Sequence, residues 1–206
     1  YSMVDDNNFP DIIEKMNDML MNCVRVKYPN GDVASYLDIK EQDRIYILFL
    51  IRELTFQQGL YLSVTKQCTC KTNVQIELKP SNFIYFQTNE KLDKFFDEYS
   101  RSFILNYKGE EWYLTMPNVG LQKSFTEYIT EEVKNKREPN LAFLKIMPFL
   151  LGNSNNMSIK EIKEELKRFQ SMTIDTFQFL NSAIGYMKFG IEELKKVCDS
   201  CGREVR

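Results

Sequence analysis

The residues best suited to chemistry are two pairs of cysteines that lie far apart in the chain. Cys68 and Cys70, in QCTCKTN, are separated by one residue, and Cys198 and Cys201, in VCDSCGREV, are separated by two. Zn²⁺ in closed structural sites prefers four tetrahedral ligands, commonly thiolates. The four cysteines therefore predict a structural zinc site. Because four thiolates leave no open position for water, a catalytic zinc ion is disfavoured.

The C-terminal cysteine pair is the stronger indication of a metal site. In CDSCG the two-residue spacing lets both sulfurs face one metal ion, and Gly202 can adopt a positive φ that turns backbone N–H groups toward the sulfurs. The first pair is spaced more tightly than the usual two to four or so residues. It lies between two strand-like runs, LYLSVTKQ and NVQIELK, which predicts a metal knuckle at the tip of a hairpin.

Two other interpretations of the cysteines remain open. A C-x-x-C pair also suits thiol exchange, so Cys198 and Cys201 could form a redox site. Such motifs usually open a helix after a strand, whereas here the sequence IEELKKV predicts a helix before the pair. The fifth cysteine, Cys23, falls on the apolar side of a predicted helix, and we expect it to be a small buried hydrophobic residue.

Composition and charge disfavour several classes of function. The chain has 206 residues, 43% of them hydrophobic and 13% aromatic, which is enough for a core, and it contains no histidine. Neither G-x-G-x-x-G nor G-x-x-x-x-G-K-[ST] occurs. The acidic pair Glu131/Glu132 lies in a Lys-rich helical stretch and is predicted to be solvated surface. The sequence thus indicates a protein that is not an enzyme and has no small-molecule substrate.

Net charge, cysteine count and the longest apolar run also indicate which partners and which cellular compartment to expect. The net charge of −2 is far from the strong basic field that phosphate neutralisation requires, so nucleic-acid binding is not expected. An odd number of cysteines, five, without a secretory signal favours a reducing compartment. The longest apolar run, IYILFLI at 45–51, is far short of the roughly 20 residues that span a bilayer, so no membrane association is expected.

Hydrophobic periodicity predicts helices at both ends of the chain and strands in its middle. A helix is expected over 10–24, and a second, capped by Asp38, should run to about residue 56 as the central buried helix. Helices are again expected from 121 onward, the last long one ending at Gly190. The strand-like segments are 60–67, 73–79, 83–87 and a hairpin over 102–117 that turns near Lys108 and Gly109.

We therefore predict an α+β fold, mostly helical, with a central small antiparallel β portion of two hairpins. A single domain over 1–206 is expected, consisting of a helical part (1–56), a β-rich part with the first cysteine pair (57–120) and a helical part that ends in the second pair (121–206). The predicted four-cysteine zinc site joins the middle hairpin to the C-terminus.

Several short segments follow one another in an order that is similar to the order found in a known protein family. These are RIYILFLIRELTF, CTC followed by NVQIEL, and much later KFGIEEL and CDSCG, spread from about residue 40 to 206. This layout resembles the baseplate hub assembly proteins of T4-like contractile-tailed bacteriophages, which are soluble proteins described as hub subunits or as hub assembly chaperones. In this resemblance Cys68, Cys70, Cys198 and Cys201 correspond to the paired cysteines of the family.

The resemblance implies a structural or assembly protein of the phage baseplate hub that acts through protein–protein contacts. Its partners would be other baseplate and tail proteins, and its location the virion baseplate or the host cytoplasm during assembly. Candidate contact surfaces are the Met-rich segment 16–22 and the aromatic segment 81–87, although core packing is the simpler explanation of both. A zinc-stapled regulatory or nucleic-acid-binding adaptor and a C-x-x-C thiol redox protein are the alternatives.

Overall fold

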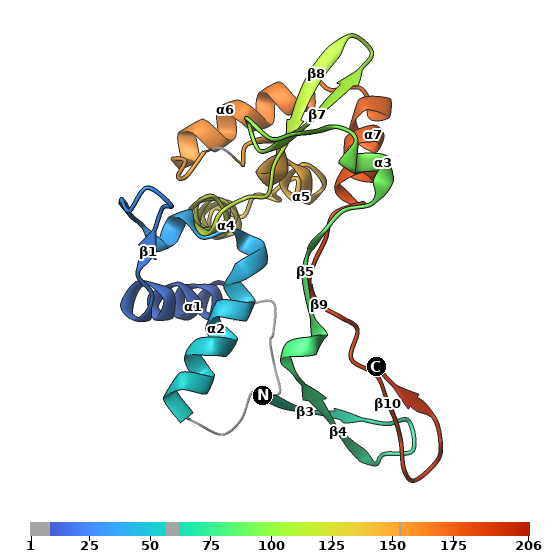
Figure 1. Ribbon diagram of the computed structural model, residues 1–206. Coiled ribbons are helices and arrows are strands. Elements are labelled where there is room, and N and C mark those ends of the chain that lie inside the picture. The colour runs from blue at the N-terminus through green and yellow to red at the C-terminus, as the bar shows by residue number, and fades with distance from the viewer. Residues whose placement is uncertain (1–8, 57–61, 153) are drawn as a thin grey trace.

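Helical patterns at the ends of the chain and strand patterns in its middle produce an α+β fold (Figure 1). The computed structural model describes residues 9–56, 62–152 and 154–206. These residues form seven α-helices and small antiparallel sheets of two or three strands, which confirms the predicted fold class. The organisation as one domain over 1–206 stays a prediction. Within the described ranges no helix combines the length and the apolar character needed to cross a membrane.

The N-terminal part consists of two helices joined by a small hairpin. Its elements are α1 (Phe9–Cys23), β1 (Val26–Lys27), β2 (Val33–Ala34), a 3₁₀ turn (Tyr36–Asp38) and α2 (Glu41–Phe56). Leu20 of α1, together with Ile39 and Val119, forms a buried cluster that attaches these elements to the start of the fourth helix. Ile13 and Leu20, on the apolar stripe of α1, are thus buried as its periodicity predicts.

Two predictions for this region were wrong. Asp38 does not cap α2: its carboxylate accepts a hydrogen bond from the N–H of Ser35 (2.8 Å), while Ser35 caps the 3₁₀ turn. The helix α2 is not the central buried helix either, since among its residues only Arg44 and Phe49 are buried, and Leu54 is 80% exposed. Its apolar residues pack on two opposite sides, against the cluster that contains Leu20 and the cluster that contains Phe83, so they do not form one apolar face.

The central strands form hairpins and one long-range ribbon. In order they are β3 (Leu62–Gln67), β4 (Asn73–Leu78), β5 (Phe83–Gln87), β6 (Phe96–Asp97), β7 (Ser102–Tyr107) and β8 (Glu110–Leu114), with the one-turn helix α3 (Glu90–Asp93) after β5. The β7–β8 hairpin turns at Lys108 and Gly109, which both have positive φ, as the predicted tight turn requires. The aromatic segment 81–87 contributes core, because Phe83 is buried against Phe49.

The C-terminal half supplies the largest cores. Its helices are α4 (Val119–Lys134), α5 (Leu141–Leu150), α6 (Ile159–Gln170) and α7 (Ile174–Ile184). A capping box of Ser158 and Glu161 is present at the start of α6. One core lies between α4, α5 and α6, and a second lies between α5, α7 and the β6–β7–β8 sheet. Trp112 packs against both cores.

The segment after α7 corrects the sequence prediction. The last helix ends at Ile184 and does not continue to Gly190, and IEELKKV is not helical. Instead β9 (Lys188–Ile191) pairs with β5, and β10 (Lys196–Val197) pairs with β11 (Glu204–Val205). Gly190 has φ 100°, which no helix accommodates. The β5–β9 ribbon runs from the helical cores toward the hairpins β3–β4 and β10–β11 (Figure 1).

A close approach at Gly120 yields a stability prediction. A Cβ added there would lie 2.0 Å from the backbone oxygen of Asn155 and 3.1 Å from Cβ of Leu37. We expect Gly120→Ala to lower the free energy of unfolding by about 1–3 kcal/mol, because α4 would have to move away from both segments. Urea denaturation followed by circular dichroism measures this change.

The control is Gly185→Ala, at a helix end where the nearest atom to the added Cβ is 3.3 Å away. This variant should change the free energy of unfolding by less than about 1 kcal/mol. Equal losses in the two variants would contradict the close packing of α4 against residues 37 and 155.

Candidate metal centre

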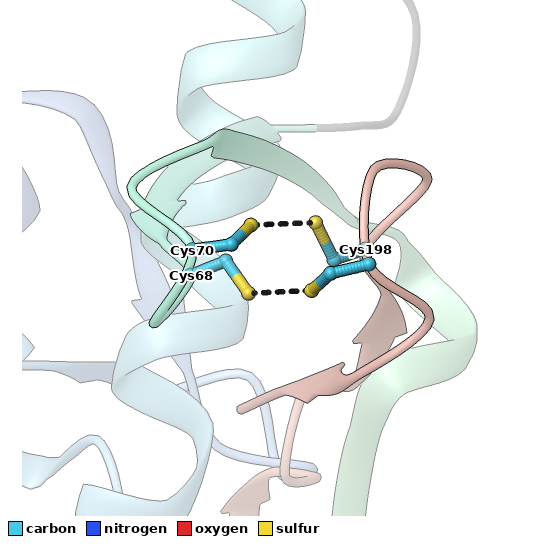
Figure 2. Close-up of side chains that lie close together, drawn as sticks. Cys68, Cys70 and Cys198 are labelled. Carbon is cyan, nitrogen blue, oxygen red and sulfur yellow. Dashed lines mark hydrogen bonds between the residues drawn. The ribbon is translucent and has the colours of Figure 1, made fainter.

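The structure brings the four predicted ligands together. Figure 2 shows Cys68 and Cys70 on one loop with their sulfurs directed at the facing loop that carries Cys198. The Sγ atoms of Cys68 and Cys201 are 3.5 Å apart, and those of Cys70 and Cys198 are 3.6 Å apart. All four sulfurs lie within 4.8 Å of one another. The chain thus joins its middle hairpin to its C-terminal end at one point.

These distances fit a metal site better than a disulfide. Bonded sulfurs lie about 2.05 Å apart, well below either measured separation. Four sulfurs arranged tetrahedrally at about 2.3 Å from a zinc ion are separated from one another by about 3.8 Å. Both measured separations are close to that value. The cluster is therefore compatible with binding one tetrahedrally coordinated metal ion.

The first knuckle is the loop between β3 and β4. Gln67 and Asn73 form the last strand pair, which leaves residues 68–72 as the loop. The N–H of Cys68 donates to the carbonyl of Thr72 (2.9 Å), and the N–H of Lys71 donates to the carbonyl of Cys68 (2.8 Å). Lys71 reverses the chain with φ 68°, a conformation that is costly for a residue with a side chain.

The second knuckle is one residue longer but is built in the same way. Val197 pairs with Glu204, which leaves residues 198–203 as the loop. The N–H groups of Cys198 and Gly202 donate to the carbonyls of Arg203 and Cys198, respectively, both at 2.8 Å. Gly202 has φ 71°, as predicted. The one-residue spacing of Cys68 and Cys70 therefore follows from a shorter loop in which Lys71 takes the place that Gly202 has in the longer one.

The cluster is buried on one side and exposed on the other. Cys68 and Cys198 are buried, whereas Cys70 and Cys201 are exposed. The buried pair packs in a small apolar cluster with side chains from both hairpins, namely Val74, Ile76 and Val205. Two further bonds cross between the hairpins: Arg203 Nη1 donates to Thr69 Oγ1 and Lys196 Nζ donates to the Gln75 carbonyl, each at 2.9 Å. The hairpins are thus oriented by contacts that do not involve sulfur.

Backbone and hydroxyl donors favour thiolates at the first knuckle. The N–H of Cys70 lowers the pKa of Cys68, and the hydroxyl and N–H of Thr72 lower the pKa of Cys70 to about 6. At the second knuckle the N–H of Arg203 acts in the same direction on Cys201, but the Cys70, Cys68 and Cys198 sulfurs and burial together outweigh it and raise the pKa of Cys201 to about 12. Four adjacent sulfurs cannot all be ionised without a cation, and a divalent metal ion would remove that conflict.

Sequence reasoning found the four ligands but missed their supporting residues. Thr69, Thr72 and Arg203 contact the knuckles, and only their adjacency to the cysteines could have indicated this. The prediction for Cys23 was wrong, since it is exposed at the end of α1. It is not part of the sulfur cluster.

The acidic pair Glu131/Glu132 also differs from the prediction. Glu132 is 7% exposed and accepts hydrogen bonds from Arg137 at 2.9 and 2.7 Å, and it forms an ion pair with Lys163 of α6 at 3.1 Å. The Arg137 and Lys163 donors hold the pKa of Glu132 below its ordinary value. The pair thus connects two helices, which helix periodicity within α4 alone could not reveal.

Comparisons of this chain with protein-family models, with curated proteins and with solved structures find no match. The class of protein is therefore defined by the fold and the site alone: an α+β protein with a four-cysteine cluster compatible with metal binding.

Loss of one sulfur should affect the whole site. We expect Cys201→Ser to lower the melting temperature of the metal-loaded protein by more than about 10 °C, because the staple between the middle and the end of the chain is lost. Cys23→Ser, outside the cluster, should leave the melting temperature within about 2 °C. Differential scanning calorimetry measures both. A Cys201→Ser effect as small as that of Cys23→Ser would contradict the shared site.

The two positive-φ residues offer a matched pair of variants. Lys71→Gly should raise the free energy of unfolding by up to about 1 kcal/mol, because glycine adopts φ 68° without a steric penalty. Gly202→Ala should lower it by about 1 kcal/mol for the converse reason. Urea denaturation of the metal-loaded protein tests both signs. Stabilisation by Gly202→Ala would contradict the knuckle geometry described here.

Proposed function

We propose that this chain is a non-enzymatic structural or assembly protein that acts through protein–protein contacts on a zinc-stapled scaffold. The observation that carries the proposal is the convergence of four cysteine sulfurs from two hairpins, with Cys68 and Cys201 separated by 133 positions in the chain. Zn²⁺ is the ion that tetrahedral thiolate sites most commonly hold. A site with four protein ligands is closed, so its role is structural.

The strands around the cysteine cluster are short, so they gain stability from a metal ion that links them. β10 and β11 have two residues each, and β9 has four. Isolated two-stranded hairpins are at best marginally stable in water. A metal ion held by both knuckles would close the β3–β4 hairpin against the β10–β11 hairpin at the end of the β5–β9 ribbon. The proposed role of the ion is thus to give this arm of the molecule a fixed shape.

The proposed setting is the baseplate hub of a contractile-tailed bacteriophage. Its support is the order of segments over residues 40–206 that resembles hub subunits and hub assembly chaperones. In this setting the partners are other baseplate and tail proteins, and the protein acts in the virion baseplate or in the host cytoplasm during assembly. A rigid scaffold without turnover suits either a permanent subunit or a chaperone.

The alternatives fit the surroundings of the site less well. In the two cysteine hairpins and the segments next to them, several basic side chains are paired with acids, as in Lys79–Glu77, Lys195–Glu193 and Arg206–Glu204. Such mixed charge does not attract phosphate strongly, which disfavours a nucleic-acid-binding adaptor. For a thiol redox protein, each sulfur of the second pair would be expected to exchange freely, whereas here each contacts a sulfur of the other hairpin.

Metal content tests the scaffold directly. The purified protein should hold about one zinc ion per chain, and Co²⁺ in its place should give the visible absorption of a tetrahedral four-thiolate site. Chelation should lower the melting temperature of the wild type but not that of a variant with all four cysteines replaced by serine. A metal-free protein of unchanged stability would overturn the zinc assignment.

The setting is tested separately by mass spectrometry of purified phage particles and of assembly intermediates. Presence in particles supports a hub subunit, and presence only in hub intermediates supports a chaperone. Absence from both, combined with salt-sensitive retention on DNA or turnover of a disulfide substrate, would favour one of the alternatives.

A further inference from the structure

A groove between α1 and α4 lies apart from the cysteine cluster. Its volume is about 620 Å³, and it is lined by both helices, with the start of α6 at one side. Apolar atoms enter from Ile13, Tyr36 and Ile159, and Ile13 is buried. The groove therefore combines apolar surface with the polar faces of two helices of 15 and 16 residues.

Charge in the groove is strongly unbalanced. Five carboxylates line it, against two lysines. Three of the carboxylates, Asp11, Glu14 and Asp18, follow one stripe of α1 at i, i+3 and i+7. On the α4 side the charges are partly compensated, because Lys123 pairs with Glu127 at 3.9 Å and Lys163 pairs with Glu131 at 3.3 Å. The excess of negative charge is thus concentrated on α1.

The α1 carboxylates have no cationic partner in the part of the chain that the structure describes. Among residues 9–56, 62–152 and 154–206, no ion pair joins Asp11, Glu14 or Asp18 to a lysine or arginine. The remaining segments, 1–8, 57–61 and 153, contain no lysine or arginine in their sequence. The lysines and arginines of this chain therefore do not neutralise the stripe.

A buried acceptor in the same groove also lacks a partner. Asn17 is 5% exposed and lines the groove, and its Oδ1 has no hydrogen-bond partner within the described residues. A buried acceptor without a donor is destabilising, so such atoms usually have a partner in the functional state. Together the Asn17 Oδ1 atom and the three carboxylates present acceptors only. An ammonium or guanidinium group, which has donors only, satisfies all of them.

The acceptors are too dispersed for a metal ion. Within the described ranges the four cysteines are the only cluster of potential ligands close enough to hold one. From Asp11 to Asp18 the stripe extends about 10 Å along α1, at about 1.5 Å per residue. Cationic side chains placed three or four residues apart on a helix are separated by about 5–6 Å, which matches this spacing. The apolar side chains in the groove can receive the apolar residues of the same helix.

We propose that the α1–α4 groove docks a basic amphipathic helix of a partner protein, which places lysine or arginine side chains against Asp11, Glu14, Asp18 and Asn17. This proposal rests on the proposed role of the chain as a docking scaffold and adds the chemistry of the partner. Charge complementarity argues for a protein helix, because the same carboxylates repel nucleic acid.

The test uses the metal-loaded full chain and a synthetic Leu/Lys amphipathic helix of about 18 residues, about 27 Å long, with the matching Leu/Glu helix for comparison. Fluorescence anisotropy should detect binding of the Leu/Lys helix only. The triple variant Asp11→Asn, Glu14→Gln, Asp18→Asn should weaken binding by roughly tenfold or more. The control triple variant Glu90→Gln, Glu98→Gln, Glu192→Gln removes the same number of exposed charges at residues that do not line the groove and should change binding less than about twofold.

A third variant, Asn17→Leu, separates binding from folding. Asn17→Leu removes the unpartnered acceptor, so it should raise the melting temperature by about 2–4 °C while weakening binding of the Leu/Lys helix. A destabilised Asn17→Leu protein would show instead that the amide has a structural role, and would count against the proposal.

Three further outcomes would overturn the assigned partner. Equal losses in the two triple variants would show a non-specific charge effect. Saturable spermidine binding that depends on Asp11, Glu14 and Asp18, without helix binding, would indicate a small polyamine ligand. Concentration-dependent dimerisation in sedimentation, abolished by the groove variant, would assign the groove to a second copy of this chain. None of these outcomes alters the metal content or tail-protein association that test the scaffold itself.

Discussion

Four sulfur atoms within 4.8 Å of one another create an electrostatic constraint on which the far end of the molecule depends. Backbone N–H groups and the Thr72 hydroxyl favour thiolates at the first knuckle, yet the Cys70 sulfur opposes ionisation of Cys201 across the cluster. A divalent cation resolves this conflict because it attracts every sulfur at once. The same cation would turn four separate side chains into a covalent-like link between residues 68–70 and 198–201.

The position of this link makes it more than a local contact. β4 leads into β5, and β9 leads toward β10, so each strand of the β5–β9 ribbon is connected to one of the two cysteine hairpins. Ribbon pairing brings the hairpins together, and closure of the hairpins in turn holds the ribbon in register. Because closing a long loop reduces the entropy of the unfolded chain, a metal ion bound by the four cysteines would reinforce the β5–β9 ribbon.

The rest of the described molecule consists of two large apolar cores and the N-terminal helices that pack on them. Its cores are formed by α4 to α7 with the β6–β7–β8 sheet, and Glu132 ties α4 to α6 through Lys163. The N-terminal helices pack on α4 through Leu20 and Val119 and leave the acidic groove at their border. In the proposed scaffold, a metal ion at the cysteine cluster would supply rigidity and the acidic groove would supply specificity.

The sequence by itself determined the local features. Cysteine type and spacing indicated the four ligands, Gly202 indicated the turn of the second knuckle, and period-two and period-3.6 patterns located most strands and helices. These features depend on neighbours within a few residues, which the sequence displays directly. The tertiary structure decided what depends on distant partners. Residues 188–191 became a strand because β5 offered an unpaired edge, and Glu132 became buried because Lys163 and Arg137 reach it. The apolar residues of α2 pack against two separate clusters on opposite sides of the helix. Pairing across the fold outweighed local preference at each of these positions, and a single sequence does not reveal such pairing.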